Sequence, residues 1–223
     1  GDSERAAGVG ARRGRRPERR RVGGKIAASC MEVPIRALVG LGNPGPEHAR
    51  QRHNVGFWLA DALAADAGED FRVQRRLKGW SAQFDCAGVP LRLFKPATFM
   101  NRSGEAVGAF AAYYHLDSTD LLIVHDDLDL PTGTIRLKRG GGHGGHNGLR
   151  DLHRVLGADY ARLRIGIGHP GHKDRVLGYV LGAPGAEEAQ ALAAGLERAV
   201  AGMELMLGQG WDKAVQYLHT EQG

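Results

Sequence analysis

Several short segments of this 223-residue chain combine histidine, aspartate and asparagine, the side-chain types that activate and position a water molecule. His53 stands at the start of a predicted helix, and Asp126 lies in the acidic run 125–129 (HDDLD). A carboxylate can hold one tautomer of a histidine and raise its basicity, so that the other ring nitrogen takes a proton from water. The pair is a candidate for general-base hydrolysis, with a capping histidine and a solvated acidic turn as the ordinary alternatives.

Other catalytic patterns find little support in the sequence. No serine stands in a G-x-S-x-G segment, and Cys86 lies inside a predicted strand without an evident base, so covalent ester chemistry has no candidate nucleophile. Gly40–Gly45 (GLGNPG) has the glycine spacing of a dinucleotide site, but Pro44 and Pro46 remove amide donors that a pyrophosphate would need. We interpret this segment as a tight turn that presents Asn43.

A second glycine-rich segment, Gly140–Gly148 (GGGHGGHNG), carries two histidines three residues apart. We find no third zinc ligand at a suitable spacing and expect neither metal nor cofactor; a metal site shared with the acids at 126–129 is the alternative, which chelator sensitivity would reveal. Glycines allow the backbone to approach a sugar-phosphate chain, and surrounding basic residues indicate an RNA contact or, more simply, a solvated charged face. These basic residues are Lys138, Arg139, Arg150, Arg154, Arg162 and Arg164.

Short apolar runs alternate with helical stripes beyond residue 33, and this alternation predicts the fold. Strands are expected at 35–40, on both sides of a turn at 88–90 within 84–94, and at 121–124, 134–137 and 163–167. Helices are expected at 55–63, at 103–114 with Ser103 as N-cap, and at 192–207, where Gly195 and Gly202 weaken the middle. The order indicates a single α/β domain, residues 34–223, with a twisted mixed, largely parallel sheet flanked by helices. Ligands of such sheets bind beyond the carboxyl ends of the strands, where the candidate residues stand.

The positive charge of the chain is concentrated near its N-terminus. Positions 1–30 carry nine basic and three acidic side chains, which leaves 21 basic and 22 acidic side chains in the remainder. We predict that residues 1–33 form a disordered, Arg-rich N-terminal extension. It could be an RNA-contacting arm, an organellar targeting segment, or a dispensable extension ahead of a native start at Met31.

Composition excludes two further classes of protein. With only Cys30 and Cys86, the chain has no disulfide framework, and a reducing compartment fits it best. The mean hydropathy is −0.33, and no apolar run approaches the roughly 18 residues that a membrane-spanning helix needs. We therefore expect no membrane association.

Six segments, in this order and over residues 35–218, together resemble the bacterial-type peptidyl-tRNA hydrolase family. They are Gly40–Gly45 (GLGNPG), Arg52–Gly56 (RHNVG), Lys95–Gly104 (KPATFMNRSG), His125–Pro131 (HDDLDLP), Gly140–Leu149 (GGGHGGHNGL) and Leu163–Pro170 (LRIGIGHP). The resemblance implies a single α/β domain that cleaves the ester between a peptide and the 3′-terminal ribose of tRNA, which recycles tRNA after stalled translation. It also implies a cytoplasmic monomer that requires no metal and acts on the acceptor stem and 3′ end of peptidyl-tRNA.

The resemblance further implies roles for individual residues. His53 matches the family's catalytic histidine, and Asp126 matches the aspartate that supports it. Asn43 and Asn101 match asparagines that hold the peptide and the attacking water. Asn147 matches a third asparagine of the site.

Four other positions complete the implied substrate site. Met100 lines the peptide channel, while Lys138 and Arg164 correspond to a basic clamp for the 5′-phosphate and acceptor stem of tRNA. His48 departs from the family, which commonly has tyrosine there, so the local packing or hydrogen bond differs. The alternative function is a non-catalytic RNA-binding or splicing factor on the same fold, against which the complete set of catalytic residues argues.

Overall fold

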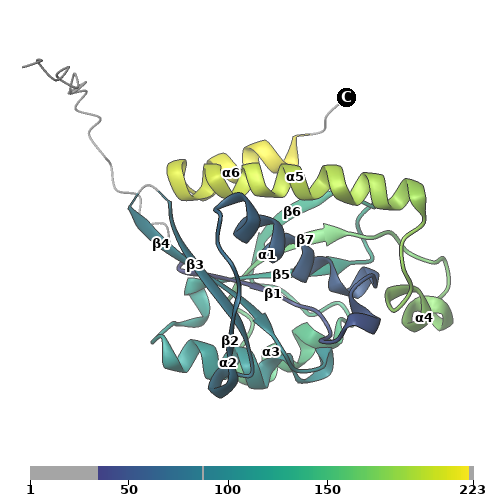
Figure 1. Cartoon of the computed structure of the whole chain (residues 1–223). Helices are drawn as coiled ribbons and strands as arrows, with labels where there is room; N and C mark the ends of the chain where they lie inside the picture. Colours follow the sequence, from purple (N-terminus) through teal and green to yellow (C-terminus); the bar gives the residue numbers. More distant parts are fainter. Residues whose placement is uncertain (1–34, 87, 221–223) are drawn as a thin grey trace, which may run out of the picture. The chain divides into compact units, whose positions relative to one another are not determined.

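The centre of the protein is a mixed β-sheet. The structure, a computed structural model, describes residues 35–86 and 88–220, and within them seven strands form one sheet in the order β2-β3-β4-β1-β5-β7-β6 (Figure 1). The strands are β1 Ala37–Gly40, β2 Arg72–Gln74, β3 Gly79–Cys86, β4 Val89–Pro96, β5 Leu121–Asp127, β6 Ile135–Arg139 and β7 Ala161–Gly166. Pairing is parallel from β4 through β1 and β5 to β7 and antiparallel at both edges, which confirms the predicted sheet. The predicted extension, residues 1–33, lies outside the described residues.

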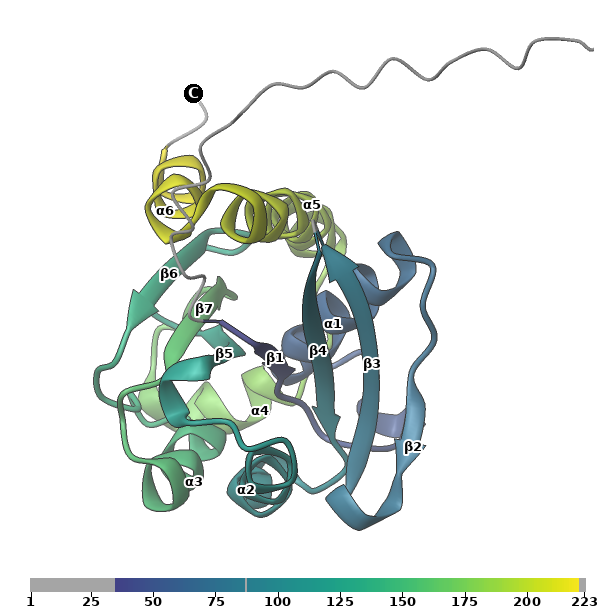
Figure 2. The ribbon, with the colours of Figure 1, turned by 90° about the vertical axis from the view of Figure 1, so that its left-hand side faces the viewer.

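Helices cover both faces of the sheet (Figure 2). One face carries α1 Val55–Asp66, α5 Ala186–Gln209 and α6 Trp211–His219, and the other carries α2 Ser103–Tyr113 and α3 Asn147–Leu156. The short α4 Val176–Val180 lies between β7 and α5 in the chain. Successive residues of a strand point to opposite faces of the sheet. Leu38 therefore packs in the core beneath α1, α5 and α6, and Val39 packs in the core beneath α2 and α3. The central strands are therefore buried on both sides, as their continuous apolar runs predict.

A close approach of two backbones places the start of α1 against the end of β1. A Cβ atom on Gly40 would lie 2.2 Å from the carbonyl oxygen of Gly56, and one on Gly56 would lie 2.5 Å from that of Leu41. Both positions therefore require glycine. The contact holds the one-turn helix Arg52–Asn54, which directly precedes α1, beside the carboxyl ends of β1 and β5.

The expected N-cap role of Ser103 is wrong. Ser103 is the first residue of α2 and Arg102 occupies the N-cap position. The Ser103 hydroxyl instead donates a hydrogen bond of 2.7 Å to the carbonyl of Met100, in the preceding turn. The hydroxyl satisfies the turn that leads into the helix, so its oxygen caps none of the α2 amides.

The long helix α5 runs without a break through its three glycines, and the two in its middle, Gly195 and Gly202, are points of close packing. A Cβ atom on Gly195 would lie 2.4 Å from the carbonyl oxygen of Gly133, and one on Gly202 would lie 2.8 Å from the Leu218 side chain. The glycines allow the helix to approach its neighbours, and their low helix propensity is outweighed. Within residues 35–86 and 88–220, no helix has the length and apolar character needed to cross a membrane.

Candidate active site

His53 and Asp126 meet at the carboxyl ends of the parallel strands. Asp126 lies near the end of β5, and His53 is the middle residue of the turn before α1. The His53 Nδ1 atom is 2.9 Å from each carboxylate oxygen of Asp126, and both side chains are buried. A carboxylate only accepts hydrogen bonds, so Nδ1 carries the proton and donates it. The other ring nitrogen, Nε2, is left with a lone pair that can accept a proton.

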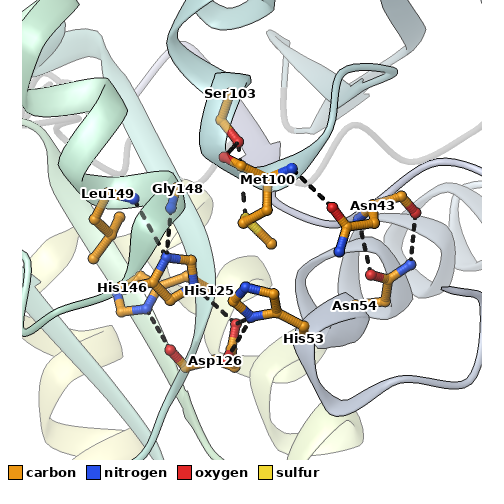
Figure 3. A network of polar contacts seen from close by, with 10 residues as sticks. All are labelled: Asn43, His53, Asn54, Met100, Ser103, His125, Asp126, His146, Gly148 and Leu149. Carbon is orange, nitrogen blue, oxygen red and sulfur yellow. Dashed lines mark hydrogen bonds and ion pairs between the residues drawn. The ribbon is translucent and has the colours of Figure 1, made fainter. Parts of the chain in front are cut away.

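A second histidine shares the same carboxylate (Figure 3). The His146 Nε2 atom lies 2.9 Å from Asp126 Oδ1, while its Nδ1 accepts the backbone N–H groups of Gly148 and Leu149 at 3.1 and 3.3 Å. His146 is thus the N-cap of α3. Two amide donors at Nδ1 require the proton to be on Nε2, so His146 also donates to Asp126.

Charge and burial shift the pKa values of His53 and Asp126 in opposite directions. Burial alone would raise the pKa of Asp126, but the charges and hydrogen bonds of His53 and His146 hold that pKa well below its usual range. Burial alone would lower the pKa of His53, yet the charge and hydrogen bond of Asp126 raise it above its ordinary value. Asp126 is therefore ionised at neutral pH, and it increases the basicity of His53.

The ligand atoms of His53, Asp126 and His146 lie within 4.8 Å of one another, close enough to surround a metal ion. The tautomer of His146 opposes that use. A metal bound to Nε2 needs the lone pair there, which moves the proton to Nδ1, where it would face the N–H groups of Gly148 and Leu149. Metal binding would therefore disrupt the cap of α3, so the geometry favours a hydrogen-bonded network. Of the metal site considered from the sequence, with His143, His146 and the acids at 126–129, His146 and Asp126 belong to this cluster and His143 does not.

Asn43 is held at the end of β1 by two neighbours. The Asn54 side chain accepts the backbone N–H of Asn43 at 2.8 Å and donates to its carbonyl at 2.9 Å, and all of these groups are buried. The backbone N–H of Met100 donates to Asn43 Oδ1 at 2.8 Å. These bonds fix the orientation of the amide, and no hydrogen bond among the described residues uses Asn43 Nδ2. The side chain therefore offers an N–H donor to a bound group.

His125 fixes the backbone beside the Asp126 carboxylate. It is fully buried on β5, and its Nδ1 lies 2.7 Å from the carbonyl oxygen of Asp126. Burial, with the charge of His146, lowers the pKa of His125 to about 4. The ring is therefore neutral at physiological pH and donates to that carbonyl.

The remaining predicted substrate residues lie around this network. Met100 is buried against Gly148, whereas Asn101 and Asn147 follow Met100 and His146 in the chain and are exposed. His48 is half-buried, and its ring meets Phe99 edge-on with centroids 6.2 Å apart. Its Nδ1 atom is buried and makes no hydrogen bond within the described part of the chain.

The two predicted tRNA contacts lie on β6 and β7, where the register pairs Arg164 with His125 of β5. Lys138, near the end of β6, is exposed and extends over Gly141. Arg164, on β7, donates to Asp127 at 2.7 Å, so part of its charge is neutralised. The register pairs Lys138 with Arg162, two residues from Arg164, so Lys138 and Arg164 are diagonal neighbours on one sheet face.

Sequence reasoning missed two parts of the site. His146 was considered only as a metal ligand, although a polar residue directly before a helix is the usual signal of an N-cap. Asn54 was not selected at all, and nothing in its sequence neighbourhood indicates that it would hold Asn43, eleven residues earlier. That contact depends on the tertiary approach of α1 to β1.

The fold and the site together define a class of protein. A buried His–Asp pair with a free imidazole nitrogen and an oriented amide donor beside it is the arrangement of a hydrolase that activates water, here on an α/β domain with a mixed sheet.

Comparison with known proteins identifies the family. The peptidyl-tRNA hydrolase family model matches residues 37–223. The chain is 47% identical to the peptidyl-tRNA hydrolase of Halorhodospira halophila over 190 residues, 85% of this chain and 98% of that protein. It is 50% identical to the enzyme of Acidithiobacillus ferrooxidans over 185 residues, 82% of this chain and 98% of the relative. The crystal structure of peptidyl-tRNA hydrolase from Acinetobacter baumannii superposes with a TM-score of 0.82 at 42% identity, covering 85% of this chain and 97% of that one. The chain belongs to the peptidyl-tRNA hydrolase family.

Proposed function

We propose that the protein hydrolyses the ester between the peptide and the 3′-terminal ribose of peptidyl-tRNA, with His53 as general base and Asp126 as its support. Family membership gives the substrate class. The observation that carries the residue roles is the pair of 2.9 Å contacts from His53 Nδ1 to the buried carboxylate. They leave Nε2 as the basic atom, and Asp126 stabilises the imidazolium that forms when water loses its proton.

An ester suits this machinery because its leaving group needs little help. Water gives a proton to His53 as its oxygen attacks the carbonyl carbon; when the tetrahedral intermediate collapses, the ester C–O bond breaks and the His53 imidazolium returns that proton to the departing ribose oxygen. The free N–H of Asn43 Nδ2 can donate to the oxygen on which negative charge develops, or to a peptide carbonyl next to it. Removing one such donor from an enzyme typically costs on the order of 10²–10³ in rate.

Selectivity for peptidyl-tRNA over aminoacyl-tRNA follows from the same amide groups. A donor of Asn43 or Asn101 that bonds to a peptide carbonyl would lose that partner when the substrate has a free α-ammonium group. Unmade hydrogen bonds in a site built for them discriminate strongly between substrates. Met100, His48 and Asn147 complete the proposed peptide and 3′-end site.

The test compares N-acetyl-aminoacyl-tRNA with unblocked aminoacyl-tRNA, with chelator present throughout. Cleavage of only the blocked substrate, abolished in His53→Ala, is the expected result. A folded protein that binds tRNA without cleaving it would instead support the non-catalytic RNA-binding alternative. Activity lost with chelator and restored by a divalent cation would contradict the metal-free mechanism.

We infer that Lys138 and Arg164 contact the 5′-phosphate and acceptor stem, since both basic side chains lie on one sheet face beside the glycine-rich loop. We also propose, from the resemblance to the family, that the enzyme is a cytoplasmic monomer. Sedimentation of the protein alone and with tRNA tests this stoichiometry.

The activity is assigned to residues 34–223. Deletion of residues 1–30 should leave turnover nearly unchanged at moderate salt, and a large loss of activity would identify that segment as an RNA-binding arm.

A further inference from the structure

Arg52 directly precedes the catalytic histidine, but its side chain contacts a different part of the molecule. The guanidinium is largely buried and donates to both carboxylate oxygens of Glu188, at distances of 2.8 to 3.2 Å. It also donates to the carbonyl of Tyr179 at 2.9 Å, and its plane lies over the Tyr179 ring, 3.9 Å from the centroid. The backbone N–H of Arg52 adds a bond of 2.9 Å to the carbonyl of Gly182. One residue thus joins the catalytic turn to the end of α4 and to the first turn of α5.

Glu188 is itself held in place. Besides Arg52, it accepts the backbone N–H of Gly185 at 2.8 Å, and the Tyr179 hydroxyl, whose one proton is shared with the carbonyl of Ile167, lies 3.1 Å from it. The hydrogen bonds from Arg52 outweigh partial burial and lower the pKa of Glu188. The carboxylate is therefore ionised at neutral pH, and the bidentate pair has a fixed geometry that a lysine could not reproduce.

A second connection leads from this group back to the catalytic aspartate. The Tyr179 hydroxyl donates to the carbonyl of Ile167, and the backbone N–H of Ile167 donates to the carbonyl of Asp127 at 3.0 Å. Residues 52–53 and 126–127 are therefore joined twice. One connection is the His53–Asp126 contact, and the other passes through Arg52, Tyr179 and Ile167.

We propose that Arg52, through Glu188 and the end of α4, is a positioning residue that fixes the His53 ring against Asp126 for catalysis. This inference rests on the proposed function. Arg52 touches no atom of the His53–Asp126 contact, so it acts only on placement, and displacement of a catalytic group by about 1 Å can cost on the order of 10²-fold in rate. A purely structural ion pair would affect the stability of the fold and leave the rate per folded molecule unchanged.

The experiment measures kcat, KM, thermal midpoint and the pH dependence of kcat for Arg52→Gln, Arg52→Lys and Glu188→Gln. Glu188→Gln preserves side-chain shape and remains informative if Arg52→Gln does not fold. The matched control is Arg198→Gln: Arg198, also on α5, donates to the carbonyls of Tyr217 and Leu218 at the end of α6, away from the catalytic turn.

Arg52→Gln is expected to lower kcat by about 10- to 10²-fold with KM changed less than threefold, and Arg52→Lys to recover part of the loss. The acidic limb of the pH profile should move to lower pH in these variants, since weaker contact with Asp126 lowers the pKa of His53. Arg198→Gln should lower the thermal midpoint while kcat and the pH profile stay at the wild-type values.

A lower thermal midpoint with unchanged kcat and an unmoved pH profile in the Arg52 and Glu188 variants would overturn the proposal, as would a change confined to KM. His53→Ala, measured in the same series, distinguishes a failure of the positioning role of Arg52 from a failure of the proposed function. If His53→Ala is inactive and Arg52→Gln is fully active, the positioning role fails and the proposed function stands. If His53→Ala retains full activity, the proposed function itself fails.

Discussion

The catalytic network and the glycine-rich loop lie in the same domain, yet they are built in opposite ways. In the network, the functional groups of His53, Asp126 and Asn43 are buried, and backbone or side-chain partners fix their orientation. In the loop of residues 140–145, which precedes His146, most residues are exposed, and several glycines have positive φ, among them Gly141 at 109°. The chemistry is thus preorganised, whereas the proposed RNA contact uses exposed charge on a backbone without bulky side chains.

This contrast predicts different kinds of mutational effect. Substitutions in the network should lower kcat, because they disturb the orientation of groups that act in the transition state. Substitutions near the loop should alter KM and its salt dependence, because they remove charge that acts on the whole tRNA.

Asp126→Asn is expected to have the largest effect of the substitutions around His53. An asparagine oxygen at the Oδ1 position could still accept from both histidines, but its NH2 group would replace Oδ2 and face the His53 Nδ1–H donor, and the negative charge would be lost. We expect kcat to fall by on the order of 10²–10⁴.

The pH–rate profile of Asp126→Asn checks the electrostatic part. His53 must be neutral to act as a base, so activity is lost as pH falls through its pKa, which Asp126 raises above 6.5. Without that charge, burial lowers the pKa, and the acidic limb should move to lower pH. An unmoved limb would show that another group controls it.

Asn54→Ala should have an intermediate effect, because it leaves the backbone N–H and C=O of Asn43 without their buried partners. Each unsatisfied buried group costs about 1–3 kcal/mol, so chemical denaturation should show a loss of stability. We also expect kcat to fall about tenfold as the Asn43 amide loses its fixed orientation. Wild-type kcat in the folded variant would show that Met100 alone orients Asn43.

Lys138→Ala should have the smallest effect and act on a different parameter. Loss of one phosphate contact should raise KM severalfold with kcat unchanged, and reduce the salt slope of tRNA binding by about one. Titrating tRNA into the variant at several salt concentrations measures that slope. A reduced kcat with an unchanged slope would show that Lys138 acts in catalysis rather than in tRNA binding. The two regions would then not differ in the kinetic parameter that they affect.

The sequence predicts the central elements of the fold well because they carry strong apolar signals. The buried runs at 35–40, 121–124 and 163–167 correspond to β1, β5 and β7. Helix α6 was missed, as were the two outer elements β2 and α4, which have only three and five residues and weak patterns. Short elements of this kind form through tertiary contacts, such as those of Arg52 with the end of α4.

The candidate site shows the same limit. The resemblance identified His53, Asp126 and Asn43, and the structure brings the first two into contact and orients the third. The contacts that make His146 and Asn54 partners of these residues span 20 and 11 residues and form only in the tertiary structure, so the sequence did not assign them these roles.

The most direct test of the account is the single-turnover rate of His53→Ala on N-acetyl-aminoacyl-tRNA, measured alongside its affinity for tRNA and its thermal midpoint. Removal of the general base should lower the rate by on the order of 10²–10⁴ while tRNA affinity and folding stay close to wild type. A folded variant that cleaves at the wild-type rate would contradict the assignment of His53 as the residue that activates water.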